Sequence, residues 1–166
     1  MAHPPDNDAV VASIRANIVF EKMIVSALTV AGPAGVAHFM IGLGGRIAAG
    51  AFSIVGAGTE LFNAIGYAFL FFLAGFAASA AVGIPLYRAL ERAKIRKMWP
   101  YALAAFALSF LILAAIGLAP SFETPARALY LVPGVAAAFL FGRKMRPFWL
   151  AAERAETPPP AVLKLH

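Results

Sequence analysis

The chain has 166 residues, of which 61% are hydrophobic and 13% charged, and its mean hydropathy is +0.79. Soluble domains carry about 25% charged residues, so these values exclude an ordinary soluble domain and indicate an integral membrane protein. There is no cysteine, which excludes thiol nucleophiles, thiolate metal sites and disulfides. The formal net charge of +6 does not predict nucleic-acid binding, because the basic residues flank apolar segments, where anionic lipid is the nearer partner.

The chain begins with a polar tail and an amphipathic lead-in helix, together residues 1–22, followed by an uncharged segment, 23–45, that is the first predicted span. This beginning also resembles a secretory signal peptide, but acidic residues such as Glu21 are atypical of one, and we expect the span to be retained. The pair Gly32-Pro33 predicts a kink or local unwinding in its middle.

Arg46 is followed by an uncharged, glycine-rich segment, 47–59. As a helix it would reach only about 20 Å, which is too short for a bilayer core of about 30 Å. An external loop, an interfacial helix and a re-entrant segment remain open as alternatives. Thr59 is expected to cap the next helix, and Glu60 to lie in its first turn near the positive end of the helix dipole.

The second predicted span, 61–87, and the basic loop behind it organise the rest of the chain. Clustered Lys and Arg are disfavoured for translocation, so this loop is expected to stay in the cytoplasm. The span contains Gly75, Ser79 and Gly83 at four-residue spacing. Such a stripe of small residues lets helices approach closely, and it predicts a packing face toward a neighbour in the same bundle or toward a second copy.

The third span is predicted at 99–122, where Trp99 and Pro100 fit a membrane interface and a first helical turn. The fourth, 128–142, is short and needs the flanking arginines to extend toward the headgroups. Pro133 predicts a kink in this helix. A second small-residue stripe is formed by Gly134, Ala138 and Gly142.

Residues 143–166 are read as a basic, proline-rich cytoplasmic tail, and its first part, 143–149, is expected to form a basic and aromatic membrane interface that includes Trp149. With both termini in the cytoplasm, all of the 14 Lys and Arg except Arg46 and Arg127 lie on the inner side. The predicted fold is therefore an all-α membrane protein of the bacterial inner membrane, a bundle of four transmembrane helices (residues 23–142) with kinked first and fourth helices. Anionic-lipid contact is expected from Arg88, Arg92, Lys94, Arg96, Lys97, Arg143, Lys144 and Arg146.

Polar residues within the spans are candidates for a site, and His38 is the most informative of them. It shares a helical stripe with Arg46, and Asn63 and Tyr67 enter the membrane from the same side. A neutral histidine that hydrogen-bonds to Asn63 or to a carbonyl would instead join two helices without a further role. The predicted polar or ligand site comprises His38, Arg46, Glu60, Asn63 and Tyr67.

Several functions are excluded by counting. The spans lack the second histidine that a haem would need and the carboxylate that proton-coupled drug export would need. The chain also contains no zinc-protease, nucleophile-elbow or P-loop motif. No cofactor or metal is predicted, and an enzyme is disfavoured.

The sequence favours a non-catalytic accessory, assembly or interaction subunit with a membrane-protein partner or a second copy. The alternative is a small-solute carrier or channel that works as an oligomer, because broken helices form binding sites in transporters. A lipid-modifying enzyme using Glu60, Arg46 and His38 ranks third.

Overall fold

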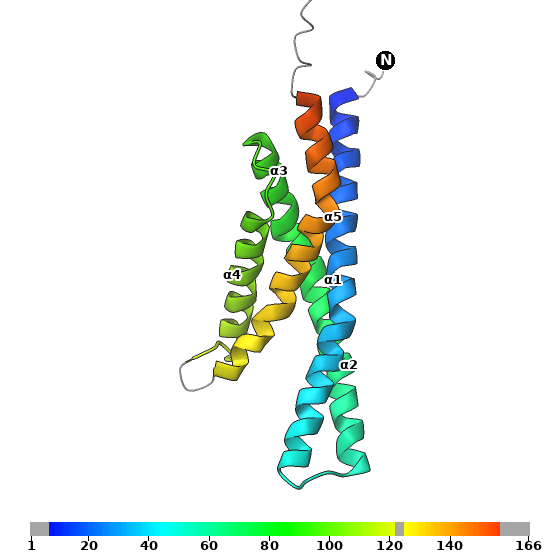
Figure 1. The fold of residues 1–166 in the computed structure, drawn as a ribbon, viewed down its shortest axis with the longest axis vertical. Coiled ribbons are helices and arrows are strands. Elements are labelled where there is room, and N and C mark those ends of the chain that lie inside the picture. Colours follow the sequence, from blue (N-terminus) through cyan, green and yellow to red (C-terminus); the bar gives the residue numbers. More distant parts are fainter. Residues whose placement is uncertain (1–6, 122–124, 157–166) are drawn as a thin grey trace, which may run out of the picture.

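The computed structural model describes residues 7–121 and 125–156, and within these ranges the chain is helical apart from short turns (Figure 1). Its elements are α1 (Asn7–Ala48), α2 (Ile54–Ala78), the π-helix η1 (Ser79–Gly83), α3 (Ile84–Arg92), α4 (Trp99–Ala115), the 3-10 helix η2 (Pro125–Leu131) and α5 (Val132–Glu156). Since η1 and α3 continue α2 without a break, the chain forms four helical rods. The predicted all-helical class and four-helix count are confirmed. The expected polar start and proline-rich end lie outside the described residues.

Three rods are long and apolar enough to cross a membrane, namely Arg15–Ala48, Ile54–Arg92 and Arg127–Arg154. The fourth, α4, has 17 residues, a length of about 26 Å against a hydrocarbon core of about 30 Å. The start of α1, the end of α5 and the α3–α4 loop lie at one end of the molecule, and the α1–α2 turn lies at the other (Figure 1). This arrangement agrees with a membrane protein.

The segment 47–59 is not a single element. It contains the end of α1, a turn and the first residues of α2. Gly50 has a φ of +66°, a conformation that glycine adopts without strain, and this residue reverses the chain. The segment is therefore part of a helical hairpin.

The α2 helix starts earlier than the sequence predicted. Its N-cap is Ser53, whose hydroxyl oxygen accepts a hydrogen bond of 3.0 Å from the N–H of Gly56. The predicted cap at Thr59 is wrong, because Thr59 lies inside the helix and donates its hydroxyl to the carbonyl of Val55 at 3.0 Å. Glu60 likewise lies beyond the first turn, which places it opposite the end of α1.

Pro33 and Pro133 occupy different positions in their helices. Pro33 lies inside α1, which is helical on both sides of it, so local unwinding does not occur there. Pro133 is the second residue of α5, directly after η2, where a missing N–H costs no helical hydrogen bond. It marks the junction between the 3-10 helix η2 and α5.

The last two helices differ in extent from the predicted spans 99–122 and 128–142. The α4 helix ends at Ala115, because Gly117 adopts a φ of +72° and the N–H of Leu118 returns to the carbonyl of Leu113 at 2.7 Å. The α5 helix continues to Glu156. A shorter third helix is thus followed by a longer fourth one.

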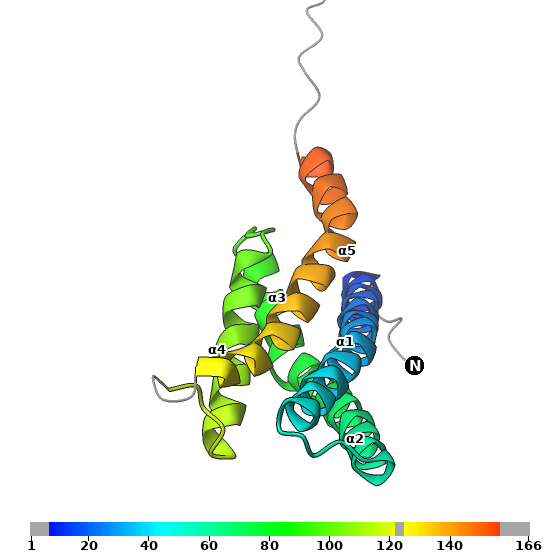
Figure 2. The same ribbon diagram turned by 60° about the horizontal axis from the view of Figure 1, so that its bottom comes forward.

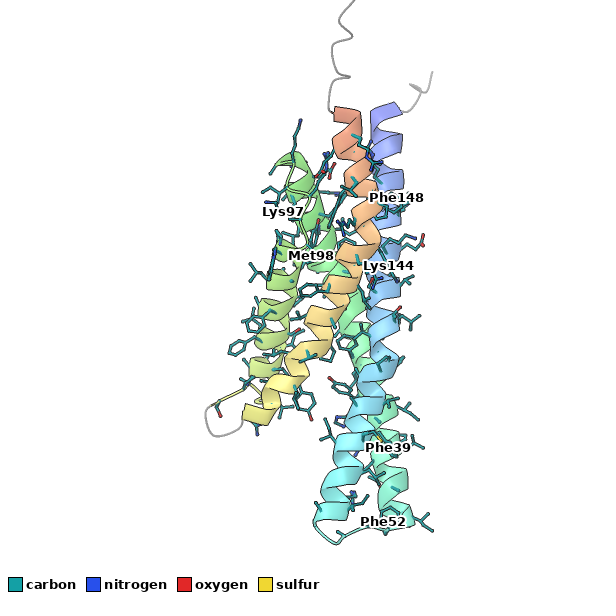
Figure 3. All side chains as sticks on the ribbon, in the orientation of Figure 1. Phe39, Phe52, Lys97, Met98, Lys144 and Phe148 are labelled. Carbon is teal, nitrogen blue, oxygen red and sulfur yellow. The ribbon has the colours of Figure 1, made fainter. Side chains whose placement is uncertain are left out.

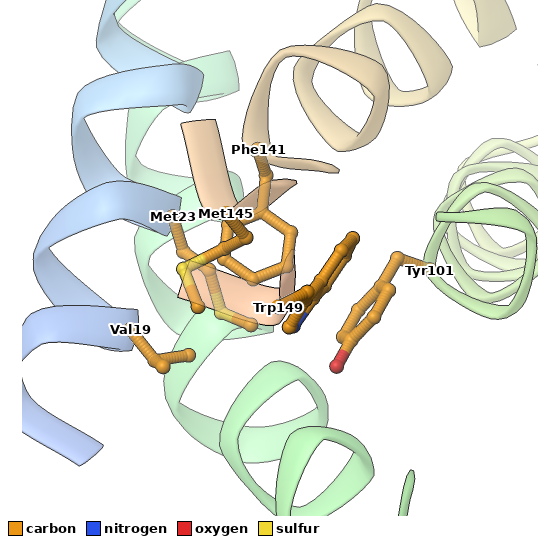
Figure 4. Packing of buried hydrophobic residues seen from close by; sticks show 6 residues of the cluster. All are labelled: Val19, Met23, Tyr101, Phe141, Met145 and Trp149. Carbon is orange, nitrogen blue, oxygen red and sulfur yellow. The ribbon is translucent and has the colours of Figure 1, made fainter. Parts of the chain in front are cut away.

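A hydrophobic cluster holds α1, α4 and α5 together near the α3–α4 loop (Figure 4). Trp149 is 7% exposed, stacks on Tyr101 with ring centroids 6.0 Å apart, and meets the edge of Phe141. Met145 is buried in the same cluster. We expected residues around 143–149 to form an aromatic membrane interface, but Trp149 faces the core because α5 continues as a helix alongside α1.

The rods pack in an open order. The α1 helix contacts α2 and α5, and α4 contacts α5 and η2, whereas α2 and α4 have little direct contact. Figures 1 and 2 show α2 and α4 on different sides of the molecule, diverging from the α3–α4 loop. The bundle is therefore not closed between α2 and α4.

The two small-residue stripes lie at contacts within this chain. A Cβ added to Gly75 would lie 2.9 Å from Cβ of Ala27 on α1, and one on Gly83 would lie 2.6 Å from the sulfur of Met23. The α5 stripe faces α4, since Gly134 lies against Ser109 and Gly142 lies against Met98; Ala138 packs against the hydrophobic cluster. Neighbours within the bundle thus contact the glycines of both stripes.

Most of the basic residues expected to contact lipid are exposed, including Arg88, Arg92, Lys97, Arg143 and Arg146. Lys97 and Lys144 lie toward the end opposite Phe52, in keeping with the predicted separation of charge (Figure 3). Lys94 is exposed and Lys144 half-buried. Arg96 differs from the others, because its side chain is 6% exposed and its Nη2 donates to Oε1 of Glu91 at 3.1 Å. That contact directs Arg96 toward the protein.

Candidate functional site

The gap between α2 and α4 contains a groove of about 590 Å³, which we call the α2–α4 groove. One wall is formed by residues between 67 and 86 of α2, η1 and α3, and the other by residues between 101 and 118 of α4 and the turn after it. Parts of α5 and α1 form the floor. Its volume lies within the range of roughly 300–1,000 Å³ that is typical of ligand pockets.

The groove is apolar along most of its length and is closed at the end near the α3–α4 loop, which we call its inner end. Alanine, glycine and leucine dominate the walls, and no Lys, Arg, Asp or Glu occurs among the described residues that line it. Tyr101, Phe141 and Met23 belong to both the groove and the hydrophobic cluster, so the cluster seals the end near the α3–α4 loop. An apolar body would be well accommodated here.

The opposite end of the groove, which we call the outer end, carries three polar rings from three different rods. His38 of α1 stacks on Tyr67 of α2, with ring centroids 4.8 Å apart and planes 15° from parallel. Tyr130 of η2 lies 6.1 Å from His38 and 5.8 Å from Tyr67, tilted against both rings. We call these three residues the ring cluster. The ring cluster thus brings His38 and Tyr67 of the predicted site into contact with Tyr130, which follows α4 in the chain.

The polar atoms of the ring cluster are not used in the fold. Within the described part of the chain, neither the imidazole nitrogens of His38 nor the hydroxyls of Tyr67 and Tyr130 take part in a hydrogen bond. Unpaired polar groups are costly in apolar surroundings, because no water compensates for the lost hydrogen bonds. A ligand or water at this end would therefore be stabilised by these groups.

The hydrogen bond considered between His38 and Asn63 is not formed. Asn63 is exposed on α2, and His38 is held by ring contacts. His38 thus joins two helices by stacking, while its nitrogens stay available. Asn63 is not brought into the ring cluster by any contact.

Arg46 and Glu60 form a separate ion pair near the α1–α2 turn. Nε of Arg46 donates to Oε1 of Glu60 at 2.7 Å, and the Glu60 side chain is 14% exposed. Glycines make room for the pair, since a Cβ on Gly42 would collide with the Glu60 carboxylate and one on Gly56 would lie 3.1 Å from Nη1 of Arg46. The two charged residues of the predicted site therefore neutralise each other and link α1 to α2 across the turn. We call this ion pair of Arg46 and Glu60 the clamp.

The clamp predicts a measurable coupling between its two members. In a double-mutant cycle with Arg46→Gln and Glu60→Gln, we expect a coupling free energy of about 1–2 kcal/mol, between the values for exposed and buried pairs, because the Arg46 side chain is partly exposed. Thermal unfolding of the purified protein in mild detergent measures it. A coupling below about 0.3 kcal/mol would show that the pair is incidental.

Tyr130 is not part of the predicted site. Its position in the chain is far from His38 and Tyr67, and only the contacts of η2 bring it to them. Ser109 also lines the groove, and its hydroxyl lies against Gly134 instead of returning to its own helix as that of Ser79 does at 2.7 Å. No pattern in the sequence predicts the position of Tyr130 or the direction of the Ser109 hydroxyl.

The described residues contain no group of three or more His, Asp or Glu side chains that could hold a metal ion. The arrangement suits the binding of an elongated, mainly apolar molecule. Comparisons with protein-family models, curated proteins and solved structures find no match for this chain.

Proposed function

We propose that this chain is a non-catalytic accessory protein of the bacterial inner membrane that holds one long-chain, lipid-like molecule in the α2–α4 groove. The observation that carries the proposal is the groove itself, which is apolar along its walls, sealed at the inner end and ringed by polar groups at the outer end. An amphiphile has the same division between a hydrocarbon body and a polar head.

The groove is long enough for a hydrocarbon chain. Its walls extend over roughly 20–30 Å, taking about 1.5 Å of rise for each lining helical residue. A hydrocarbon chain can lie along apolar walls of this length with its polar head beside the ring cluster.

An accessory role agrees better with the helices than a carrier does. The carrier alternative depended on interruptions in the first and fourth spans, and α1 is helical on both sides of Pro33, while Pro133 lies at the start of α5. A lipid-modifying enzyme would need the charges of Arg46 and Glu60, and these are paired with each other. Partners of such an accessory protein would be a membrane protein or a second copy, together with anionic lipid at the basic end.

Native mass spectrometry of the protein extracted from its membrane in mild detergent tests the proposal. We expect a bound lipid-like mass that is lost in Ala74→Phe and Ala104→Phe, which place a ring in the groove from α2 and α4. Ala77→Phe and Ala107→Phe are matched controls, because these alanines are exposed on the same helices outside the groove.

Retention of the bound mass in both groove variants would overturn the proposal. The same spectra report the assembly. A heteromer supports an accessory subunit, and a homo-oligomer leaves the carrier open.

The proposed topology is tested with reporter fusions. Reporters after His166 and near Lys94 should read cytoplasmic, and reporters near Ser53 or Thr124 should read external, because the Lys and Arg bias directs the basic end inward. An external reading at Lys94 would contradict the whole orientation.

A further inference from the structure

We infer that the head of the bound molecule is an uncharged planar ring that carries hydroxyl or carbonyl oxygens, and that His38, Tyr67 and Tyr130 bind it at the outer end of the groove. This inference rests on the proposed function and adds the chemistry of the head. It follows from the geometry, the charge and the hydrogen-bonding capacity of the ring cluster.

The geometry favours a ring. His38 and Tyr67 are nearly parallel at 15°, and Tyr130 is tilted by 47° and 59° against them, so flat faces and edges are presented side by side at one end of the groove. Aromatic groups prefer offset-stacked or edge-to-face neighbours with centroids about 4.5–7 Å apart. A planar head can continue this cluster, whereas a branched glycerol head has no flat face to offer.

The charge distribution favours a neutral head. None of the described residues that line the groove is Lys, Arg, Asp or Glu. Two cations lie near this end but outside the lining: Nε of Arg46 donates to Oε1 of Glu60 at 2.7 Å, and Nη1 of Arg127 donates to the carbonyl oxygen of Gly117 at 3.2 Å. A phosphate or carboxylate would find no cation among the lining residues and would have to draw Arg127 away from Gly117, which disfavours a charged head.

The hydrogen-bonding capacity indicates oxygen atoms on the ring. A phenol hydroxyl both donates and accepts, and a neutral imidazole has one donor and one acceptor nitrogen. These groups of Tyr67, Tyr130 and His38 take part in no hydrogen bond in the described chain. Hydroxyl or carbonyl oxygens on the head would satisfy them.

Three probes, each with twelve chain carbons, test the inference on the full-length protein in nanodiscs. They are 4-dodecylphenol, dodecylbenzene, which lacks the oxygen, and dodecanoate, which lacks the ring and is charged. We expect the phenol to bind roughly tenfold or more tightly than either of the others, as one or two hydrogen bonds would give. Binding is measured at equal mole fractions in the lipid.

Variants locate the head. Tyr67→Phe and Tyr130→Phe keep the ring and remove the hydroxyl, so each should weaken 4-dodecylphenol roughly threefold to tenfold and leave dodecylbenzene unchanged. Tyr87→Phe is the matched control, because Tyr87 packs against the hydrophobic cluster and does not line the groove. It should leave the affinity for all three probes unchanged.

The outcomes separate this inference from the proposed function. Equal or tighter binding of dodecanoate, or undiminished phenol binding in Tyr67→Phe and Tyr130→Phe, would overturn the inference about the head. If Ala74→Phe still abolished binding of the probes, the groove would remain a binding site. If none of the three probes bound at all, or Ala74→Phe had no effect, the proposed function itself would fail.

Discussion

Replacing Trp149 by alanine is expected to lower the free energy of unfolding by about 3–5 kcal/mol, the range for truncating a large buried aromatic residue. Trp149 is 7% exposed and contacts Tyr101 and Phe141, so its removal leaves a cavity where α1, α4 and α5 meet. Loss of near-ultraviolet circular dichroism on heating in mild detergent measures the effect.

The control for this variant is its neighbour Phe148→Ala. Phe148 is 47% exposed, so its truncation should cost less than about 1 kcal/mol, as surface substitutions usually do. Equal losses in the two variants would contradict the buried position of Trp149. They would instead support the membrane-interface role that the sequence suggested for it.

Gly142→Leu is expected to give the second large loss of stability, roughly 1–3 kcal/mol or more, because it inserts a side chain into a packed contact. Even a Cβ at this position would lie 2.5 Å from Cβ of Met98, at the start of α4. The α4 helix would have to move away from α5. Thermal unfolding in detergent measures the loss.

Gly66→Leu on α2 is the matched control, since a Cβ there meets nothing within 4 Å. Leucine has a higher helix propensity than glycine, so this variant should be as stable as the parent protein or slightly more stable. A comparable loss in both variants would show that the glycines act through local helix properties and not through the α4–α5 contact.

The sequence predicts which segments are helical better than it predicts which helices contact one another. Composition and uncharged segments were enough for the helical class and the helix count, because both depend on local hydrophobicity. The ends were harder. Ser53 and Gly117 are ordinary cap and stop signals, but counting uncharged residues included Ser53 in a loop and Gly117 in a span.

The candidate site was predicted only in part, because its composition depends on how the helices cross. His38 and Tyr67 do meet, and Arg46 and Glu60 do pair, since all four lie on facing stripes of one hairpin. Tyr130 reaches them only through the path of η2. The burial of Trp149 likewise depends on α5 running beside α1, which no local pattern in the sequence reports.

The length of α1 has a consequence for how this protein should respond to temperature. Its 42 residues extend about 63 Å, roughly twice the hydrocarbon thickness, so in the proposed topology Val19, Met145 and Trp149 pack outside the lipid. Burial there removes apolar surface from water, whereas helices within lipid associate mainly through van der Waals packing. The hydrophobic contribution weakens on cooling. Cold should therefore loosen the α1–α5 extension while the membrane-embedded helices stay assembled.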